Sequence, residues 1–143
     1  VGHATRVARH AERIASSEGG DMAVVMAAAY LHDIGIPEAE KKHGSSAARY
    51  QEEEGPPVAR QIMEDVGAAD AMIDEVCDII GHHHHPRENE TMNFRVLYDA
   101  DLIANLEDSA KNKEPDKAHI EKVISRQFFT EAGQKRAKKI FLQ

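Results

Sequence analysis

The sequence predicts an all-α fold: a single compact domain, residues 1–143, of seven to eight helices. Apolar residues recur at helical spacing through nearly the whole chain, and the alternating pattern of a half-buried strand is absent. No long linker divides the sequence, and 143 residues are enough to bury a core within one domain. Functional side chains are therefore expected on helices that face one another.

Two helices are predicted at the start of the chain. Residues 3–17 carry their apolar side chains on one face, and Gly19-Gly20 ends this helix. Asp21 is a suitable N-cap for the second helix, residues 22–33. Its segment MAVVMAAAYL carries no charge, so this helix belongs at the centre of the domain.

The middle of the chain is predicted as a loop followed by three helices. Residues 36–42 form a loop or short turn, and residues 43–53 form a helix that stops at Gly55. Pro56-Pro57 opens the next helix, since proline is tolerated in a first turn. A helix begins at Asp70 or Ala71, and its apolar stripe reaches His83. A polar loop over 86–90 leads to a helix over 93–109, and a polar linker covers 111–115. Asp116 caps the next helix, which runs to about 127, and the last helix covers 130–142.

The composition limits the classes of partner. A net charge of −7 argues against binding a nucleic acid polymer, whereas a bound cation would still allow a small phosphorylated substrate. The single cysteine, Cys77, permits no internal disulfide and suggests a reducing, cytoplasmic location. No membrane span or signal peptide is visible, and a homo-oligomer is compatible with the sequence. The chain begins Val1-Gly2 without Met, so we expect upstream residues.

The dipeptide His32-Asp33 ends the uncharged segment. Burying an imidazole and a carboxylate side by side is costly unless something pairs with them. A metal ion is a suitable partner because neutral imidazole and carboxylate are both metal ligands.

Other ligand-type residues lie on or beside apolar faces. Helix phase directs His83 towards the core and leaves His82 at the edge of the stripe, while His3 borders the apolar face of the first helix. Asp101 shares a face with Leu97 and Ala104, and Asp99 is the competing carboxylate. Each residue alone fits an ordinary buried or surface polar group, but together they favour a metal site inside a helical bundle.

These residues match the H…HD…D signature of the HD-domain superfamily of metal-dependent phosphohydrolases. The resemblance covers almost the whole chain and includes Leu31-His-Asp-Ile-Gly35 and Asp99-Ala-Asp101. It implies that His3, His32, Asp33 and Asp101 hold one divalent metal. It also implies that Asp101, rather than Asp99, is the last ligand.

The sequence also resembles the two-metal members of this superfamily. By that resemblance Asp33 would bridge two ions, and His43, His82 and His83 would supply ligands to the second. The Gly-Tyr-Pro signature is missing after the histidine pair, so cyclic dinucleotide hydrolysis is not expected. Mixed nitrogen and oxygen ligands are compatible with Mn, Fe, Co, Ni or Zn, and disfavour Mg.

The implied activity is metal-dependent hydrolysis of a small phosphate ester, such as a nucleotide, by a phosphomonoesterase or phosphodiesterase. Metal-activated water would attack, and Asp33 would orient the water or take its proton. Arg6 is a candidate catalytic and phosphate-binding residue, with Lys42 and Arg87 as further phosphate ligands. The alternatives are a two-iron oxygenase of the HD type and a non-catalytic HD module that binds metal or ligand.

Overall fold

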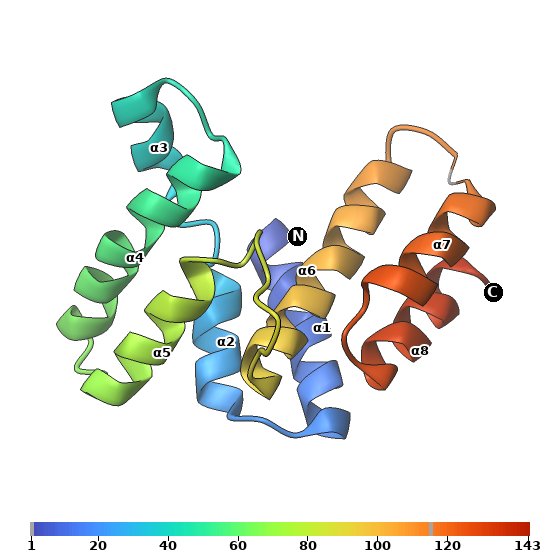
Figure 1. Ribbon diagram of the computed structural model, residues 1–143, viewed down its shortest axis with the longest axis horizontal. Helices are drawn as coiled ribbons and strands as arrows, with labels where there is room; N and C mark the ends of the chain where they lie inside the picture. Colours follow the sequence, from blue (N-terminus) through green and yellow to red (C-terminus); the bar gives the residue numbers. More distant parts are fainter. Residues whose placement is uncertain (1, 115) are drawn as a thin grey trace.

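The computed structural model describes residues 2–114 and 116–143 of the chain. The described residues form helices and no strand, as the sequence predicts. There are eight of these helices (Figure 1): α1 (His3–Glu18), α2 (Met22–Leu31), α3 (Ile36–His43), α4 (Ala48–Asp65), α5 (Asp70–Ile80), α6 (Met92–Ala110), α7 (Lys117–Gln127) and α8 (Glu131–Phe141).

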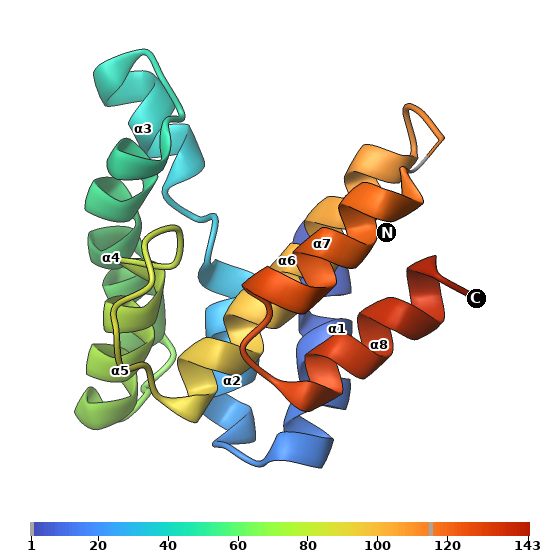
Figure 2. The ribbon, with the colours of Figure 1, turned by 45° about the vertical axis from the view of Figure 1, so that its right-hand side comes forward.

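Helices α1, α2 and α6 form the centre of the molecule. Helix α1 packs against both α2 and α6, and α2 also packs against α5 and α6. The helices α3, α4 and α5 lie on one side of this centre, and α7 and α8 lie on the other (Figures 1 and 2). The core where the central helices meet is aliphatic, with Val7, Val25, Leu97 and Ile103 fully buried. Apolar burial at this centre is the main term that favours the fold.

Side-chain caps fix where several helices begin. The Asp21 side chain accepts hydrogen bonds from the backbone N–H groups of Ala23 and Val24, which confirms it as the N-cap of α2. Asp116 caps α7 in the same way. Thr91 caps α6 by accepting from the N–H of Phe94, so the helix that carries Asp101 has a fixed start. Each cap satisfies a backbone donor that has no partner within the helix.

The prediction of a loop over residues 36–42 was wrong, because these residues form α3. Pro37 occupies the first turn, where the missing N–H costs nothing, and Gly44 ends the helix with φ at 67°. Ala39 is fully buried, so the packing of α3 against α4 supports this short helix.

The predicted break at Gly55 was also wrong, since α4 continues through Gly55-Pro56-Pro57. Proline inside a helix costs roughly 3 kcal/mol, so packing has to compensate. Gly55 is buried against the backbone of Gly35, and Ala59 is fully buried one turn later. A single α4 keeps both contacts, whereas two separate helices would lose the alignment between them.

Helix α5 ends at Ile80 rather than continuing to His83. Gly81 follows as the C-cap, and His82 and His83 lie in the turn beyond it. The turn is compact because the N–H of His85 donates to the carbonyl of His82. His83 is buried, as helix phase predicts, and His82 is slightly more exposed, although both lie beyond the end of the helix. In the described part of the chain, no helix has the length and apolar character needed to cross a bilayer.

Candidate metal centre

Three side chains converge, from α1, from α6 and from the residue that follows α2. Nε2 of His3, in α1, lies 2.9 Å from Oδ1 of Asp101, in α6. Nε2 of His32, which follows α2, lies 3.2 Å from the same oxygen. One ligand atom from each of the three residues lies within 4.8 Å of the other two, as expected for donors that share one ion.

Asp33 connects this group to a second one. Its Oδ2 lies 3.2 Å from Nε2 of His32 and 3.8 Å from Nε2 of His3. Its other oxygen, Oδ1, lies 3.6 Å from Nε2 of His83. Asp33, His83 and His84 form a second group whose ligand atoms lie within 4.8 Å of one another. One carboxylate thus faces two sets of histidines, which is the arrangement a bridging ligand requires.

Backbone carbonyls orient the two buried imidazoles. Nδ1 of His32 donates to the carbonyl of Ala29 at 2.7 Å, and Nδ1 of His83 donates to the carbonyl of Ile80 at 2.8 Å. With Nδ1 as the donor, Nε2 is the nitrogen that presents its lone pair to an ion when the ring is neutral. This arrangement fixes both the ring orientation and the tautomer.

The residues present fit a metal ion. His32 and His83 are only 2% and 3% exposed, and no described residue forms a hydrogen bond with the Nε2 of either ring. A buried nitrogen without a partner is costly, and an ion would supply that partner. The nearby carboxylate oxygens lie at ion-pair distances from His32 but without hydrogen-bond geometry.

The electrostatics of the site are those of tightly coupled opposite charges. Burial lowers the pKa of His32, but the neighbouring Asp101 and Asp33 outweigh this and raise it to about 10. Burial raises the pKa of Asp101, yet His3 and His32 hold it well below its usual range. The pKa of Asp33 is held low in the same way by His32 and His83. Both carboxylates are therefore ionised near neutral pH and ready to bind a cation.

Asp108 is a site residue that the sequence analysis missed. Its Oδ2 accepts a hydrogen bond from Nδ1 of His3 at 3.0 Å, and its other oxygen accepts from the guanidinium of Arg6. A carboxylate that holds the distal nitrogen of a histidine ligand is a common support for a metal site. The available signal was its spacing, because Asp108 lies two helical turns after Asp101 on the same face of α6.

Arg6 lies beside the metal centre, with its side chain engaged by carboxylates. It pairs with Asp108 and with Glu107, and it also donates to the carbonyl of Ala104. Arg6 thus orients Asp108, and Asp108 in turn orients His3. Its contact with a substrate phosphate stays a prediction.

Two predicted ligands do not join these groups. Nε2 of His82 lies 2.9 Å from Glu90, its Nδ1 donates to the carbonyl of Asp78, and its ring stacks on Phe94. His43 stacks on Tyr50, and its Nε2 lies 2.9 Å from Glu54. The structure brings His84, not His43 or His82, together with Asp33 and His83.

The other candidate phosphate ligands are exposed and paired with acids. Nζ of Lys42 lies 3.0 Å from Glu54, and the guanidinium of Arg87 lies 3.0 Å from Asp78. Surface pairs of this kind contribute little to stability, so a phosphate can compete for either cation. Their role in substrate binding stays a prediction.

Asp99, the competing carboxylate, has a different role from Asp101. It is fully buried and accepts hydrogen bonds from the N–H groups of Phe129 and Thr130 and from the hydroxyl of Thr130. Burial raises its pKa to about 6, although these hydrogen bonds oppose the rise. Asp99 thus fixes the turn between α7 and α8 and is not among the converging ligands.

Comparisons with known proteins agree with this site. The family model of the HD domain matches residues 1–126. A predicted HD superfamily hydrolase from an uncultured Thermotogales bacterium, known from its crystal structure, is similar with a TM-score of 0.70 and 29% sequence identity. The match covers 96% of this chain and 70% of that one. The search of curated proteins found no match.

Proposed function

This chain belongs to the HD-domain family, and from that premise we propose that it is a phosphohydrolase that cleaves a small phosphate ester, such as a nucleotide. The observation that carries the proposal is the position of Asp33. One of its oxygens faces His32 and His3, and the other faces His83. This arrangement would supply ligands to two ions about one shared carboxylate, which is typical of sites that clamp both sides of a phosphoryl group.

Four residues would hold the first ion: His3, His32, Asp33 and Asp101. His83 and His84, together with Asp33, would hold a second. A divalent ion at such a site neutralises phosphate oxygens and lowers the pKa of a bound water towards neutrality. Mixed imidazole and carboxylate donors are compatible with Mn, Fe, Co, Ni or Zn.

The chain's own residues contribute position and charge. Asp33 is half-exposed and ionised, so it can accept a hydrogen bond from the attacking water and orient it. Because its pKa is low, Asp33 is better suited to orienting the water than to accepting its proton. Asp108 and Arg6 hold the His3 ring, so the first ligand set is already arranged before substrate arrives.

Phosphate release from a panel of monoesters and diesters tests this proposal. Protein loaded separately with Mn²⁺, Co²⁺, Ni²⁺ or Zn²⁺ should hydrolyse at least one nucleotide, and a chelator should abolish the activity. Asp33→Asn should lose activity, whereas Asp65→Asn, an exposed site on α4, should retain it. The proposal fails if metal-loaded protein hydrolyses no member of the panel.

The same experiment separates the competing functions. The shared Asp33 would also suit a pair of irons, so oxygen uptake by iron-loaded protein without phosphate release would indicate an oxygenase. Nucleotide binding at the metal without turnover would indicate a non-catalytic module. Comparing monoesters with diesters decides between the two phosphatase classes.

A further inference from the structure

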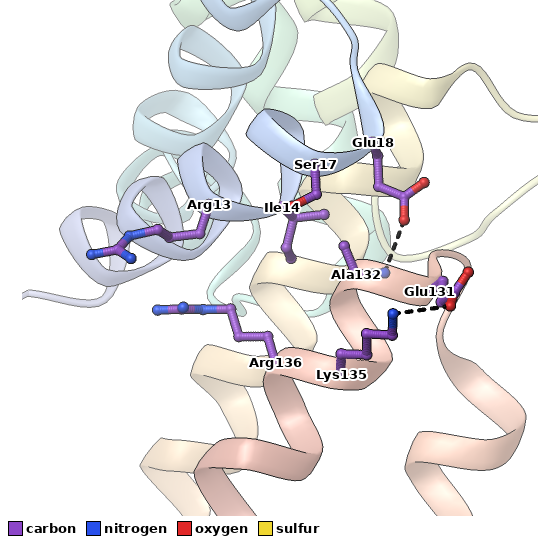
Figure 3. Close-up of a pocket in the computed structure, with 8 residues that line it drawn as sticks. All are labelled: Arg13, Ile14, Ser17, Glu18, Glu131, Ala132, Lys135 and Arg136. Carbon is purple, nitrogen blue, oxygen red and sulfur yellow. Dashed lines mark hydrogen bonds and ion pairs between the residues drawn. The ribbon is translucent and has the colours of Figure 1, made fainter.

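A second polar pocket lies away from the metal ligands, between the C-terminal half of α1 and the start of α8. Its volume is about 530 Å³, and Figure 3 shows the side chains that line it. Three basic residues (Arg13, Lys135 and Arg136) and two acidic residues (Glu18 and Glu131) contribute to the wall. We refer to it as the Arg13–Arg136 pocket. It is net positive on a chain whose net charge is −7.

The acidic residues of this pocket are already occupied. Glu18 accepts a hydrogen bond from the backbone N–H of Ala132 at 2.8 Å, and so serves the first turn of α8. Glu131 lies 3.1 Å from Nζ of Lys135 (Figure 3). The N–H of Gly133 is also used, by the hydroxyl of Thr130. The open cationic groups of the pocket are therefore its two arginines and not the helix N-terminus.

Arg13 and Arg136 extend in the same direction from α1 and α8, on the side of the pocket away from Glu131 (Figure 3). Within residues 2–114 and 116–143, no carboxylate lies within ion-pair distance of either guanidinium. Burial lowers the pKa of Arg136, the charge of Arg13 lowers it further, and the charge of Glu107 opposes both. Two like charges thus face one space without an anion between them.

Arg136 is held in place by a neutral partner. Its Nε donates to Nδ1 of His10 at 2.8 Å. Because that nitrogen accepts, the other ring nitrogen of His10 carries the hydrogen and donates to Glu107 at 2.8 Å. The His10 ring is 5% exposed, so its orientation is fixed by packing as well as by both hydrogen bonds. The amino groups of Arg136 remain free to bind a ligand.

We propose that the Arg13–Arg136 pocket binds the phosphate group of a small molecule. Guanidinium groups bind phosphate through paired N–H donors, and two of them can engage several oxygens at once. The volume lies within the range of small-molecule sites, and Ile14 and Ala132 add apolar wall beside the charged end. This site is separate from the metal ligands, and the inference does not depend on the proposed hydrolysis.

Titration with inorganic phosphate at constant ionic strength, followed by ¹⁵N NMR of the zinc-loaded protein, tests the site. The amide signals of Ser17, Glu18 and Ala132 should shift. Arg13→Gln should weaken this response by about tenfold, the effect of losing one charged pair of hydrogen bonds. Arg126→Gln, an exposed arginine on α7, is the matched control and should leave the affinity unchanged.

Phosphate bound at the metal centre can be distinguished from phosphate bound in the Arg13–Arg136 pocket by which amide signals shift and by a variant of the metal centre. His32→Ala should remove responses near the metal ligands but leave those at Ser17 and Ala132. Arg13 is exposed, so Arg13→Gln should fold normally, which a thermal melt would verify. The proposal is overturned if Arg13→Gln binds phosphate as the wild type does, or if all shifts are confined to the metal ligands.

Discussion

Asp108 holds the distal nitrogen of His3, 3.0 Å from Nδ1, while the other ring nitrogen lies 2.9 Å from Asp101. One imidazole thus connects a supporting carboxylate to a candidate ligand carboxylate. Both acids lie on α6, two helical turns apart, so α1 and α6 together define the position of the ring. This relationship extends the candidate site beyond the residues that the HD motif identifies.

Replacing the supporting carboxylate should weaken metal binding without removing a ligand. Asp108→Ala leaves Nδ1 of His3 without its acceptor, and loss of such a partner typically lowers metal affinity about 10–100-fold. Calorimetric titration with Mn²⁺ or Zn²⁺ would measure the change. Asp65→Ala, an equivalent change at an exposed position on α4, is the control. Unchanged affinity in Asp108→Ala would show that the hydrogen bond has no effect on the site.

The paired histidines after α5 should differ in their effect on metal content. His83→Ala removes a buried nitrogen that lacks a protein partner, so it should reduce the amount of bound metal. His82→Ala removes a ring already satisfied by Glu90 and Asp78, so metal content should stay near the wild-type value. Elemental analysis of both variants gives the comparison directly. Equal losses in the two would contradict the assignment of His83.

The sequence predicted the long helices and the candidate metal-binding residues on or beside the central helices. His3, His32 and Asp101 converge as expected, with Asp33 beside them, because α1, α2 and α6 bury their apolar faces against one another. The all-helical fold follows from the same periodicity.

Tertiary contacts decided the features that the sequence did not reveal. Helix phase placed His83 inward but did not identify His84 as its neighbour at Asp33, because the helix ends at Ile80 and a turn carries both residues. Local propensity suggested a break at Pro56 and Pro57, whereas packing keeps α4 continuous. Asp108 carries no motif of its own. Its spacing from Asp101 places it on the same face of α6, and its contact with His3 identifies its role.

Metal binding should strengthen as pH rises. The pKa of His32 in the metal-free protein is raised from 6.5 to about 10, so near neutral pH the ring carries a proton that an ion has to displace. The apparent affinity should therefore rise by up to about tenfold per pH unit for each proton released. Titrations between pH 6 and 8 would measure the slope, and an affinity independent of pH would contradict a protonated His32.

The stability of the metal-free protein should fall as pH rises, whereas the metal affinity should increase. A raised histidine pKa adds stability that is fully present below pH 6.5 and is lost as pH rises through about 10. Each coupled proton corresponds to at most about 1.4 kcal/mol per pH unit. Urea unfolding of chelator-treated protein at pH 6.5 and pH 9 should show lower stability at the higher pH. Equal or greater stability at pH 9 would be inconsistent with this linkage.

The two carboxylates of Asp99-Ala-Asp101 should separate stability from metal binding. Asp99→Ala leaves the buried donors of Phe129 and Thr130 unsatisfied, which should cost about 2–3 kcal/mol of unfolding free energy. Metal content should be unchanged, because Asp99 is not among the converging ligands. Asp101→Ala should have the reverse effect, with loss of metal as the main result. Urea unfolding and elemental analysis on both variants test the pair.

Gly35, two residues after Asp33, should tolerate no side chain. A Cβ added there would lie 2.6 Å from the carbonyl oxygen of Gln51 and from the nitrogen of Gly55, and both are backbone atoms that cannot move aside cheaply. Gly35→Ala should therefore force α3 and α4 apart and lower the unfolding free energy by about 1–3 kcal/mol.

Gly55→Ala is the matched control, because its Cβ would meet Gly35 at 3.7 Å, an ordinary contact distance. Alanine is the better helix former, but a Cβ directly before Pro56 disfavours the helical backbone, so this variant should lower the unfolding free energy by less than Gly35→Ala does. Urea unfolding of the two variants measures the difference. If Gly35→Ala were as stable as Gly55→Ala, the prediction would be wrong. The close approach between Gly35 and α4 would then not determine the packing beside the candidate metal centre.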